Sequence, residues 1–202
     1  MEEPTFDKKL VESLQAIAGE GMHNAARGFS DLLGHKVEVT QPTVKLVPIL
    51  DIQNYVGGPD VEAIGIYLRA EGEITGQIML IIPYQKALEL VDLLMEQPEG
   101  TTKQIGHHER SALGEVGNLT ATFFMNSVAK RTGTSIRPTP PAVMIDMVGA
   151  ILDIIVASSG GVSDHVLLME ANFTDNDRAV EAEFWVLPDA SALKALKVEN
   201  LK

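Results

Sequence analysis

The chain has 202 residues, 45% of them hydrophobic and 22% charged, so it is long enough to bury a substantial core as one domain or two small ones. Its formal net charge of −12 argues against nucleic acid and anionic membranes as partners, because both are bound through basic surfaces. The chain has no cysteine, which excludes a disulfide framework, a thiol nucleophile and a thiolate metal site.

Neither the first residues nor the most apolar stretch is typical of an exported or membrane protein. The opening sequence MEEPTFDKKL has no basic segment followed by an apolar one, so we expect no signal peptide. The longest apolar run, Val143 to Ala157, is too short to span a bilayer and carries two aspartates. We expect a cytoplasmic protein in which this run forms a buried or docking helix.

The first half of the chain begins with a predicted long helix from Phe6 to Leu33, which Gly34 would end. A short strand is expected at Val37 to Val39. The segment Val44 to Val47 fits either an extended piece or a short helix.

Two runs rich in Ile and Leu, Ala63 to Ala70 and Gly76 to Ile82, then predict an antiparallel hairpin. An amphipathic helix is predicted from Tyr84 to Glu96. The segment Gln97 to Gln104 contains proline, glycine and paired threonines, so it reads as a linker.

The order of elements then recurs. The elements expected in the second half are a helix from about His108 to Arg131, an extended piece at Ser135 to Ile136, a proline-rich turn, the apolar run, strands at His165 to Asn172 and Ala179 to Leu187, and a last helix from Ala190 to Leu196. A shift of 99 residues aligns the halves without a gap, placing Leu14 on Leu113, Ile17 on Val116, Gly34 on Gly133 and Pro42 on Pro141.

The predicted fold class is α+β, although this order of elements fits several α+β sandwiches. We expect one domain, residues 1–202, that contains two pseudo-symmetric repeats at about 6–97 and 105–202. Each repeat would supply a long helix, a short strand, a helix and antiparallel strands, and together they would form one α/β sandwich.

One face of the helix in the second half is polar. Ser111, Glu115 and Asn118 fall within a sector of roughly 60° on a helical wheel, while Leu113 and Val116 point the other way. The face presents a carboxylate beside a carboxamide to solvent or to a partner. Considered alone, this arrangement also fits an ordinary solvated helix face.

The spacing Ser, three residues, Glu, two residues, Asn, 22 residues, Pro ends at Pro141. With the run His23, Asn24, Ala25, Ala26 and the following Leu32, Leu33 and Gly34, it resembles the CheC/CheX/FliY family of chemotaxis phosphatases. The resemblance extends from about residue 8 to 196, and CheC is the most similar of the three.

The resemblance implies a chemistry that fits the residue types. Asn118 has no titratable group, but its amide donates and accepts hydrogen bonds and so can orient a water molecule. The family role implied for Asn118 is insertion into the active site of a phosphorylated CheY-type response regulator, whose aspartyl phosphate is hydrolysed. Glu115 would pair with the regulator's lysine, and Ser111 and Pro141 would support the site. The expected Mg²⁺ belongs to the regulator, so we expect no cofactor or metal on this chain.

The same shift of 99 residues places Glu12, Ala16, Gly19 and Pro42 on the four motif positions. The first repeat therefore lacks both the glutamate and the asparagine. We expect a degenerate first site and a single site in the second repeat.

A non-catalytic adaptor is the alternative function. Such a protein would bind the phosphorylated regulator, or the deamidase CheD, without turnover. CheD binding by CheC proteins uses a helix that the Val143 to Ala157 run resembles, with Asp153 as a candidate contact. The other interpretation of this run is a core helix whose aspartates lie at its solvent-exposed edge.

Overall fold

The computed structural model describes residues 8–34, 36, 38–39, 43–159, 165–175 and 178–188. Its helices are α1 (Lys8–Leu33), α2 (Tyr84–Leu94), α3 (His107–Thr132) and α4 (Val148–Ser159), with a 3-10 helix, η1 (Ile49–Asn54). Its strands are β1 (Glu38–Val39), β2 (Thr43–Pro48), β3 (Glu62–Gly72), β4 (Gly76–Pro83), β5 (Ile136–Pro138), β6 (Ala142–Met147), β7 (His165–Asp175) and β8 (Arg178–Pro188).

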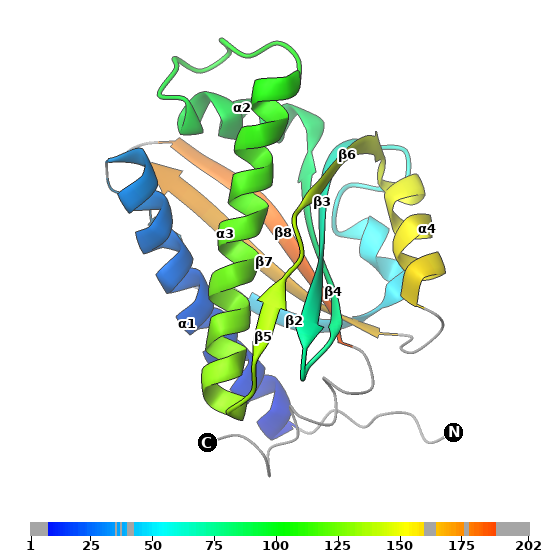
Figure 1. Ribbon diagram of the computed structural model, residues 1–202. Coiled ribbons are helices and arrows are strands. Elements are labelled where there is room, and N and C mark those ends of the chain that lie inside the picture. Colours follow the sequence, from blue (N-terminus) through cyan, green and yellow to red (C-terminus); the bar gives the residue numbers. More distant parts are fainter. Residues whose placement is uncertain are drawn as a thin grey trace.

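The strands form one antiparallel sheet in the order β1-β7-β8-β4-β3-β5, with β2 also paired to β7 and β6 also paired to β3 (Figure 1). The predicted hairpin is confirmed as β3 and β4, with Ile66 opposite Leu80. Each half gives its two small strands to the other half: β2 joins β7, and β6 joins β3. The sheet is therefore shared between the halves.

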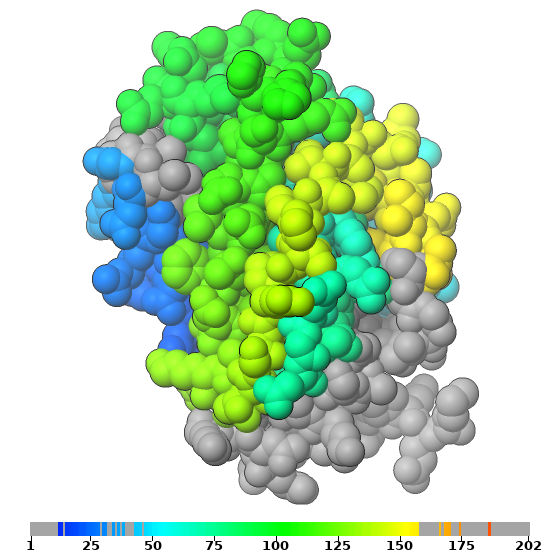
Figure 2. All heavy atoms as spheres, in the orientation of Figure 1, coloured from blue at the N-terminus to red at the C-terminus, as the bar shows by residue number. Residues whose placement is uncertain are grey.

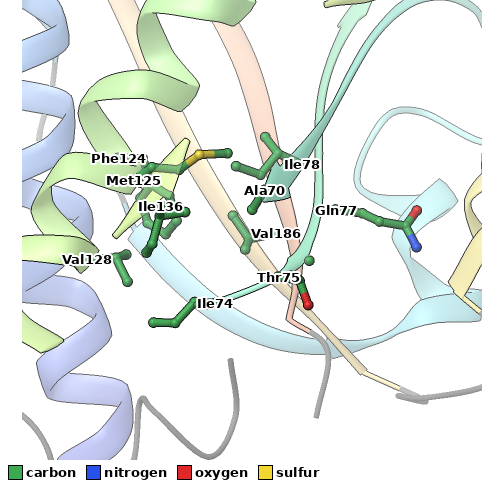
Figure 3. Close-up of a pocket in the computed structure, with 11 residues that line it drawn as sticks. Ala70, Ile74, Thr75, Gln77, Ile78, Phe124, Met125, Val128, Ile136 and Val186 are labelled. Atoms are coloured by element: carbon green, nitrogen blue, oxygen red, sulfur yellow. The ribbon is translucent and has the colours of Figure 1, made fainter. Parts of the chain in front are cut away.

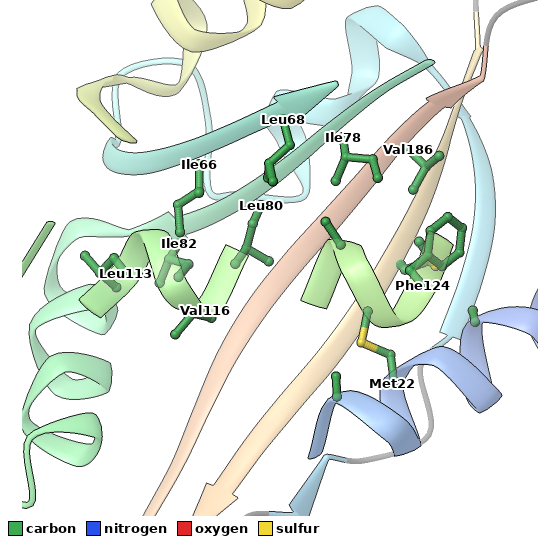
Figure 4. Packing of buried hydrophobic residues seen from close by; sticks show 14 of the residues in the cluster. Met22, Ile66, Leu68, Ile78, Leu80, Ile82, Leu113, Val116, Phe124 and Val186 are labelled. Atoms are coloured by element: carbon green, nitrogen blue, oxygen red, sulfur yellow. The ribbon is translucent and has the colours of Figure 1, made fainter. Parts of the chain in front are cut away.

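Side chains of β4 alternate between two hydrophobic clusters because successive strand residues point to opposite faces. Ile78, Leu80 and Ile82 join the cluster under α1, α2 and α3 (Figure 4). Met79 and Ile81 join the second cluster, under α4 and η1. Helices thus cover both faces of the sheet, and the predicted α+β class is confirmed.

The two long helices, α1 and α3, lie side by side on one face of the sheet (Figure 1). Gly34 follows α1 with a φ of 72°, and Gly133 follows α3 with a φ of 70°. Glycine adopts this left-handed conformation without the steric cost that a Cβ imposes. The predicted stops of both helices are confirmed.

The prediction of one helix from Val143 to Ala157 is wrong. Residues Ala142–Met147 form strand β6, and α4 begins only at Val148. The free edge of β3 accepts the first part of the run, and Ile64 and Ile66 pair with Ile145 and Val143. Tertiary strand pairing therefore decides the conformation where local hydrophobicity does not.

Other parts of the predicted order have different outcomes. The segment Val44 to Val47, predicted as extended or as a short helix, lies within strand β2. Both bounds of α3 lie 99 residues after those of α1, and both bounds of β6 lie 99 residues after those of β2. The predicted helix at Ala190 to Leu196 lies outside the described residues. Among the helices that the structure describes, none has the length and apolar character needed to cross a membrane.

Candidate functional site

The start of α3 is fixed by two carboxylates. Glu109 accepts a hydrogen bond from the Gly106 N–H at 2.9 Å. Ahead of it, the buried carboxylate of Asp92 accepts the N–H groups of Thr101 at 3.0 Å and Thr102 at 2.8 Å. Burial alone would raise the pKa of Asp92, but these hydrogen bonds outweigh it and hold the pKa below its ordinary value of 3.8. The predicted linker is thereby tied to the end of α2.

The polar face of α3 is arranged as the helical wheel predicts. Ser111 and Glu115 are exposed and Asn118 is half-buried, whereas Leu113 and Val116 lie in the core. The surface of α3 runs between α1, in blue, and the β5–β6 segment, in yellow-green (Figure 2). The carboxylate of Glu115 is exposed and therefore accessible to a protein partner, and the half-buried Asn118 follows it by three residues on the same face.

Pro141 lies directly against this part of α3. A Cβ built on Gly114 would be 3.6 Å from the Pro141 Cγ and 3.5 Å from the Val143 Cγ2. Gly114 and Asn118 are one helical turn apart, so they lie on adjacent positions of the helix surface. The structure thus brings Pro141 to the turn of α3 that precedes Asn118.

The segment that carries Pro141 is anchored to β3. Thr139 donates its N–H to the Arg69 carbonyl at 2.9 Å and accepts the Arg69 N–H at its hydroxyl, also at 2.9 Å. Ala70 of β3 is opposite Pro138, and Tyr67 of β3 is opposite Ala142. Between these two pairs, β3 has two residues, whereas the β5–β6 segment has three. This extra residue is a β-bulge, which bends a strand and redirects a side chain. It directs the Pro140–Pro141 segment toward the helix.

Sequence reasoning missed the two glycines that flank Glu115. Gly114 leaves room for Pro141, and Gly117 rests on β3: a Cβ at Gly117 would be 2.4 Å from the Ile66 Cγ2. The detectable signal was two glycines within one turn of a helix, because each costs about 1 kcal/mol relative to alanine. Glycine in such a place indicates close approach of another element.

The corresponding positions of α1 present a different surface. Glu12 and Ala16 are exposed and Gly19 is half-buried, while Pro42 lies outside the described residues. These positions offer neither the Glu115 carboxylate nor the Asn118 carboxamide. The chemical pair is present on α3 and is missing at the matching positions of α1.

Other candidate sites in the described part of the chain lack convergent polar groups. No group of three His, Cys, Asp or Glu side chains there is arranged to hold a metal ion. The His107 and His108 rings meet edge to face, with centroids 5.8 Å apart, and do not form a chelating pair. A pocket between the end of α3 and β4 is lined mainly by apolar side chains, among them Phe124, Ile78 and Val186, and none of the motif residues lines it (Figure 3).

Asp153, the candidate contact for CheD, is exposed on α4. This helix covers the face of the sheet opposite α3. Asp146, which was expected on the same helix, instead lies on β6, where its carboxylate accepts the Met147 N–H at 2.8 Å. Asp153 therefore belongs to a surface separate from the motif.

The stretch that carries these features matches a known family. The model of the CheC-like family matches residues 109–145, which include Glu115, Asn118 and Pro141. Over 195 residues the chain is 27% identical to a Bacillus subtilis (strain 168) protein named CheY-P phosphatase CheC, covering 95% of this chain and 93% of that protein. The chain is similar to CheC-like proteins.

Solved structures share the fold of this chain at low sequence identity. FliY from Thermotoga maritima matches with a TM-score of 0.74 and 20% identity, covering 95% of this chain and 96% of that one. A chain of the FliG–FliM complex from H. pylori matches with a TM-score of 0.68 and 12% identity, covering 93% and 99%. At these identities the likeness concerns the fold alone.

Proposed function

We propose that the protein is a phosphatase that hydrolyses the aspartyl phosphate of a CheY-type response regulator in chemotaxis signalling. The observation that carries this proposal is that Glu115 and Asn118 share one face of α3, with Pro141 packed against the same helix at Gly114. The similarity to a protein named CheY-P phosphatase CheC supports it. We assign the chemistry to Glu115 and Asn118, with Ser111 and Pro141 in support.

The proposed chemistry needs no titratable group on this chain. An acyl phosphate is already reactive, so the main requirement is a water molecule held in line with the phosphorus atom. The Asn118 carboxamide supplies one donor and one acceptor for that water. Fixing the water in this geometry lowers the entropic part of the barrier. The Mg²⁺ ion in this scheme belongs to the regulator.

Glu115 would bind rather than react. Its exposed carboxylate is accessible to the active-site lysine of the regulator, and the complex would remove this ion pair from water. Because Asn118 follows Glu115 by three residues on the same face, a regulator docked on Glu115 would bring its phosphate near the carboxamide.

We further propose that residues 1–202 form one domain built by duplication, with repeats at about 6–97 and 105–202. The equal spacing of α1 and β2 and of α3 and β6 supports this proposal. If β1 is exchanged with β5, β3 with β7 and β4 with β8, the strand order is the same read from the opposite edge of the sheet. Only the second repeat would carry a working site.

The decisive experiment measures phosphate release from a phosphorylated CheY-type regulator with Mg²⁺ and substoichiometric protein. The wild type should clear many equivalents of phosphate, and Asn118→Ala should lose on the order of 100-fold in rate because the water is no longer oriented. A matched Asn126→Ala control changes an exposed asparagine two turns further along α3 and should keep the activity. Equal rates for Asn118→Ala and the wild type would reject the proposal.

A second candidate function is an adaptor that binds the phosphorylated regulator, or CheD through Asp153, without turnover. The observation that favours it is the fold match to a chain of the FliG–FliM complex, whose name refers to an assembly and not to an enzyme. An adaptor would bind the regulator but release at most a stoichiometric amount of phosphate. The multiple-turnover measurement therefore separates the two functions.

A further inference from the structure

We infer that Gly117 is a positioning residue for the proposed phosphatase site, because it sets how deeply α3 sits on β3 and hence where Asn118 lies relative to Pro141. The inference rests on the proposed function. Gly117 touches no substrate in this scheme, and its effect passes through the position of the helix.

The contact beneath Gly117 is rigid. A Cβ at this position would be 2.4 Å from the Ile66 Cγ2 and 3.3 Å from the Ile66 Cβ. Ile66 is fully buried in the cluster under α3 and is directed from β3 toward that helix (Figure 4). A β-branched side chain in a packed core has little rotamer freedom, so an added methyl group would have to displace the helix.

The strands beneath α3 couple this contact to the site. Ile66 on β3 is the register partner of Val143 on β6, and Val143 follows Pro141 by two residues. Val143 and Pro141 contact α3 at Gly114. Arg110 adds a hydrogen bond from its Nη1 to the Val143 carbonyl at 3.2 Å. Helix α3 therefore rests on a connected platform of Ile66, Val143 and Pro141, which it meets at Gly114 and Gly117, the residues that directly precede Glu115 and Asn118.

The two glycines differ in the space around them. At Gly114 an added Cβ would meet its neighbours at 3.5 and 3.6 Å, which is ordinary contact distance. At Gly117 the nearest atom would be 2.4 Å away, inside any contact that a packed core tolerates. Sterics therefore require glycine at 117 if α3 is to keep its present depth.

The first test is Gly117→Ala in the full chain, with steady-state phosphate release from the phosphorylated regulator as the readout. A displacement of the carboxamide by about 1 Å is expected to lower kcat on the order of 100-fold. KM and regulator binding should change much less, because exposed Glu115 can adjust to the docked partner. A drop in binding with kcat unchanged would contradict a positioning role.

The second test is rescue with Gly117→Ala combined with Ile66→Ala. Truncation removes the Cγ2 and leaves the Ile66 Cβ, 3.3 Å away, as the nearest side-chain atom of that residue. The double variant should regain most of the lost kcat although its melting temperature falls, since Ile66→Ala opens a cavity in the core. Activity that falls together with the melting temperature would show a merely structural role and overturn the inference.

Gly149→Ala is the matched control. It places an alanine in another helix, α4, where the added Cβ would be 3.3 Å from Pro59. It should leave kcat unchanged. If wild type releases phosphate and Gly117→Ala does so equally well, only this inference fails. If wild type itself shows no turnover, the proposed function fails and the inference fails with it.

Discussion

Helices α1 and α3 have the same length, 26 residues each, lie side by side and end at glycines of nearly equal φ, yet their outward faces differ. The outward face of α3 carries Ser111, Glu115 and Asn118, whereas the matching positions of α1 are Glu12, Ala16 and Gly19. The inward faces are both apolar, with Ile17 and Val116 at matching positions. The comparison teaches that packing and chemistry on one helix are specified by different residues.

A reason for this independence is energetic. Substitutions at exposed positions usually change stability by less than about 0.5 kcal/mol, whereas truncating a buried Ile or Leu costs about 2 to 5 kcal/mol. Glu115 is exposed, and Ile17 and Val116 are almost fully buried. A helix can therefore lose its polar motif while the fold retains its stability.

Among the substitutions that test the difference between α1 and α3, we expect the largest effect at Glu115. Glu115→Gln keeps the shape of the side chain but removes the charge that would pair with the regulator's lysine. Binding of the phosphorylated regulator should weaken by about 2 to 5 kcal/mol, because the lysine would be left buried and unpaired. Calorimetric titration measures this loss, and Glu12→Gln on α1 is the control that should bind normally. Equal affinities for all three proteins would contradict the role given to Glu115.

We expect the next largest effect, on the stability of the fold, from Asp92→Asn in the segment that precedes α3. In Asp92→Asn, one of the N–H groups of Thr101 and Thr102 would face an amide donor, which should destabilise the fold by about 1 to 3 kcal/mol. The pKa of Asp92 is lowered in the fold from its ordinary value of 3.8. The ionised carboxylate therefore stabilises the protein fully at pH values above 3.8. This stabilisation is lost as the pH falls through the lowered pKa.

Thermal melts from neutral pH down to acid pH measure both effects of Asp92. The wild type and Asp92→Asn should differ most near neutrality and converge at the acid end. A constant difference at every pH would show that the charge of Asp92 does not contribute.

Loss of the ion pair between the two long helices is expected to have a smaller effect on the free energy of unfolding. Glu20 on α1 accepts a hydrogen bond from Lys130 at 2.7 Å and lies 3.7 Å from Arg131, both on α3. The Lys130 hydrogen bond lowers the pKa of Glu20. Since the pair is largely solvated, Glu20→Gln should cost only about 0.2 to 1 kcal/mol in urea unfolding, and less at high salt. A larger loss, insensitive to salt, would indicate a buried role.

The smallest expected effect is a gain of function on α1. Ala16→Glu with Gly19→Asn restores the two missing residue types at the matching positions. If the scaffolds are equivalent and independent, the rate of phosphate release should rise by at most about twofold. The informative version carries Asn118→Ala as well, so that any remaining turnover comes from α1. No turnover in that variant would show that the α1 side has lost more than two side chains.

The arrangement of the candidate site could be predicted from sequence because helical periodicity fixes which side chains share a face. The period of 3.6 residues places Glu115 and Asn118 together on α3, whereas their proposed roles came from the family resemblance. The strand β6 could not be read in this way, since its residues form a strand by pairing with β3, far away in the sequence. The role of Gly117 was hidden for the same reason: the clash that forbids a larger residue involves Ile66, on another element.

The exchange of small strands between the halves also limits how short this protein can become. β5 and β6, which carry the bulge at Pro141, are hydrogen-bonded to β3, and Ile66 beneath Gly117 belongs to β3 as well. A fragment that begins at residue 105 would keep every motif residue and lose the strand that shapes their surroundings. We therefore expect the half without a motif to be needed for the surroundings of the motif, so a shortened protein that lacks β3 should lose the arrangement around Pro141.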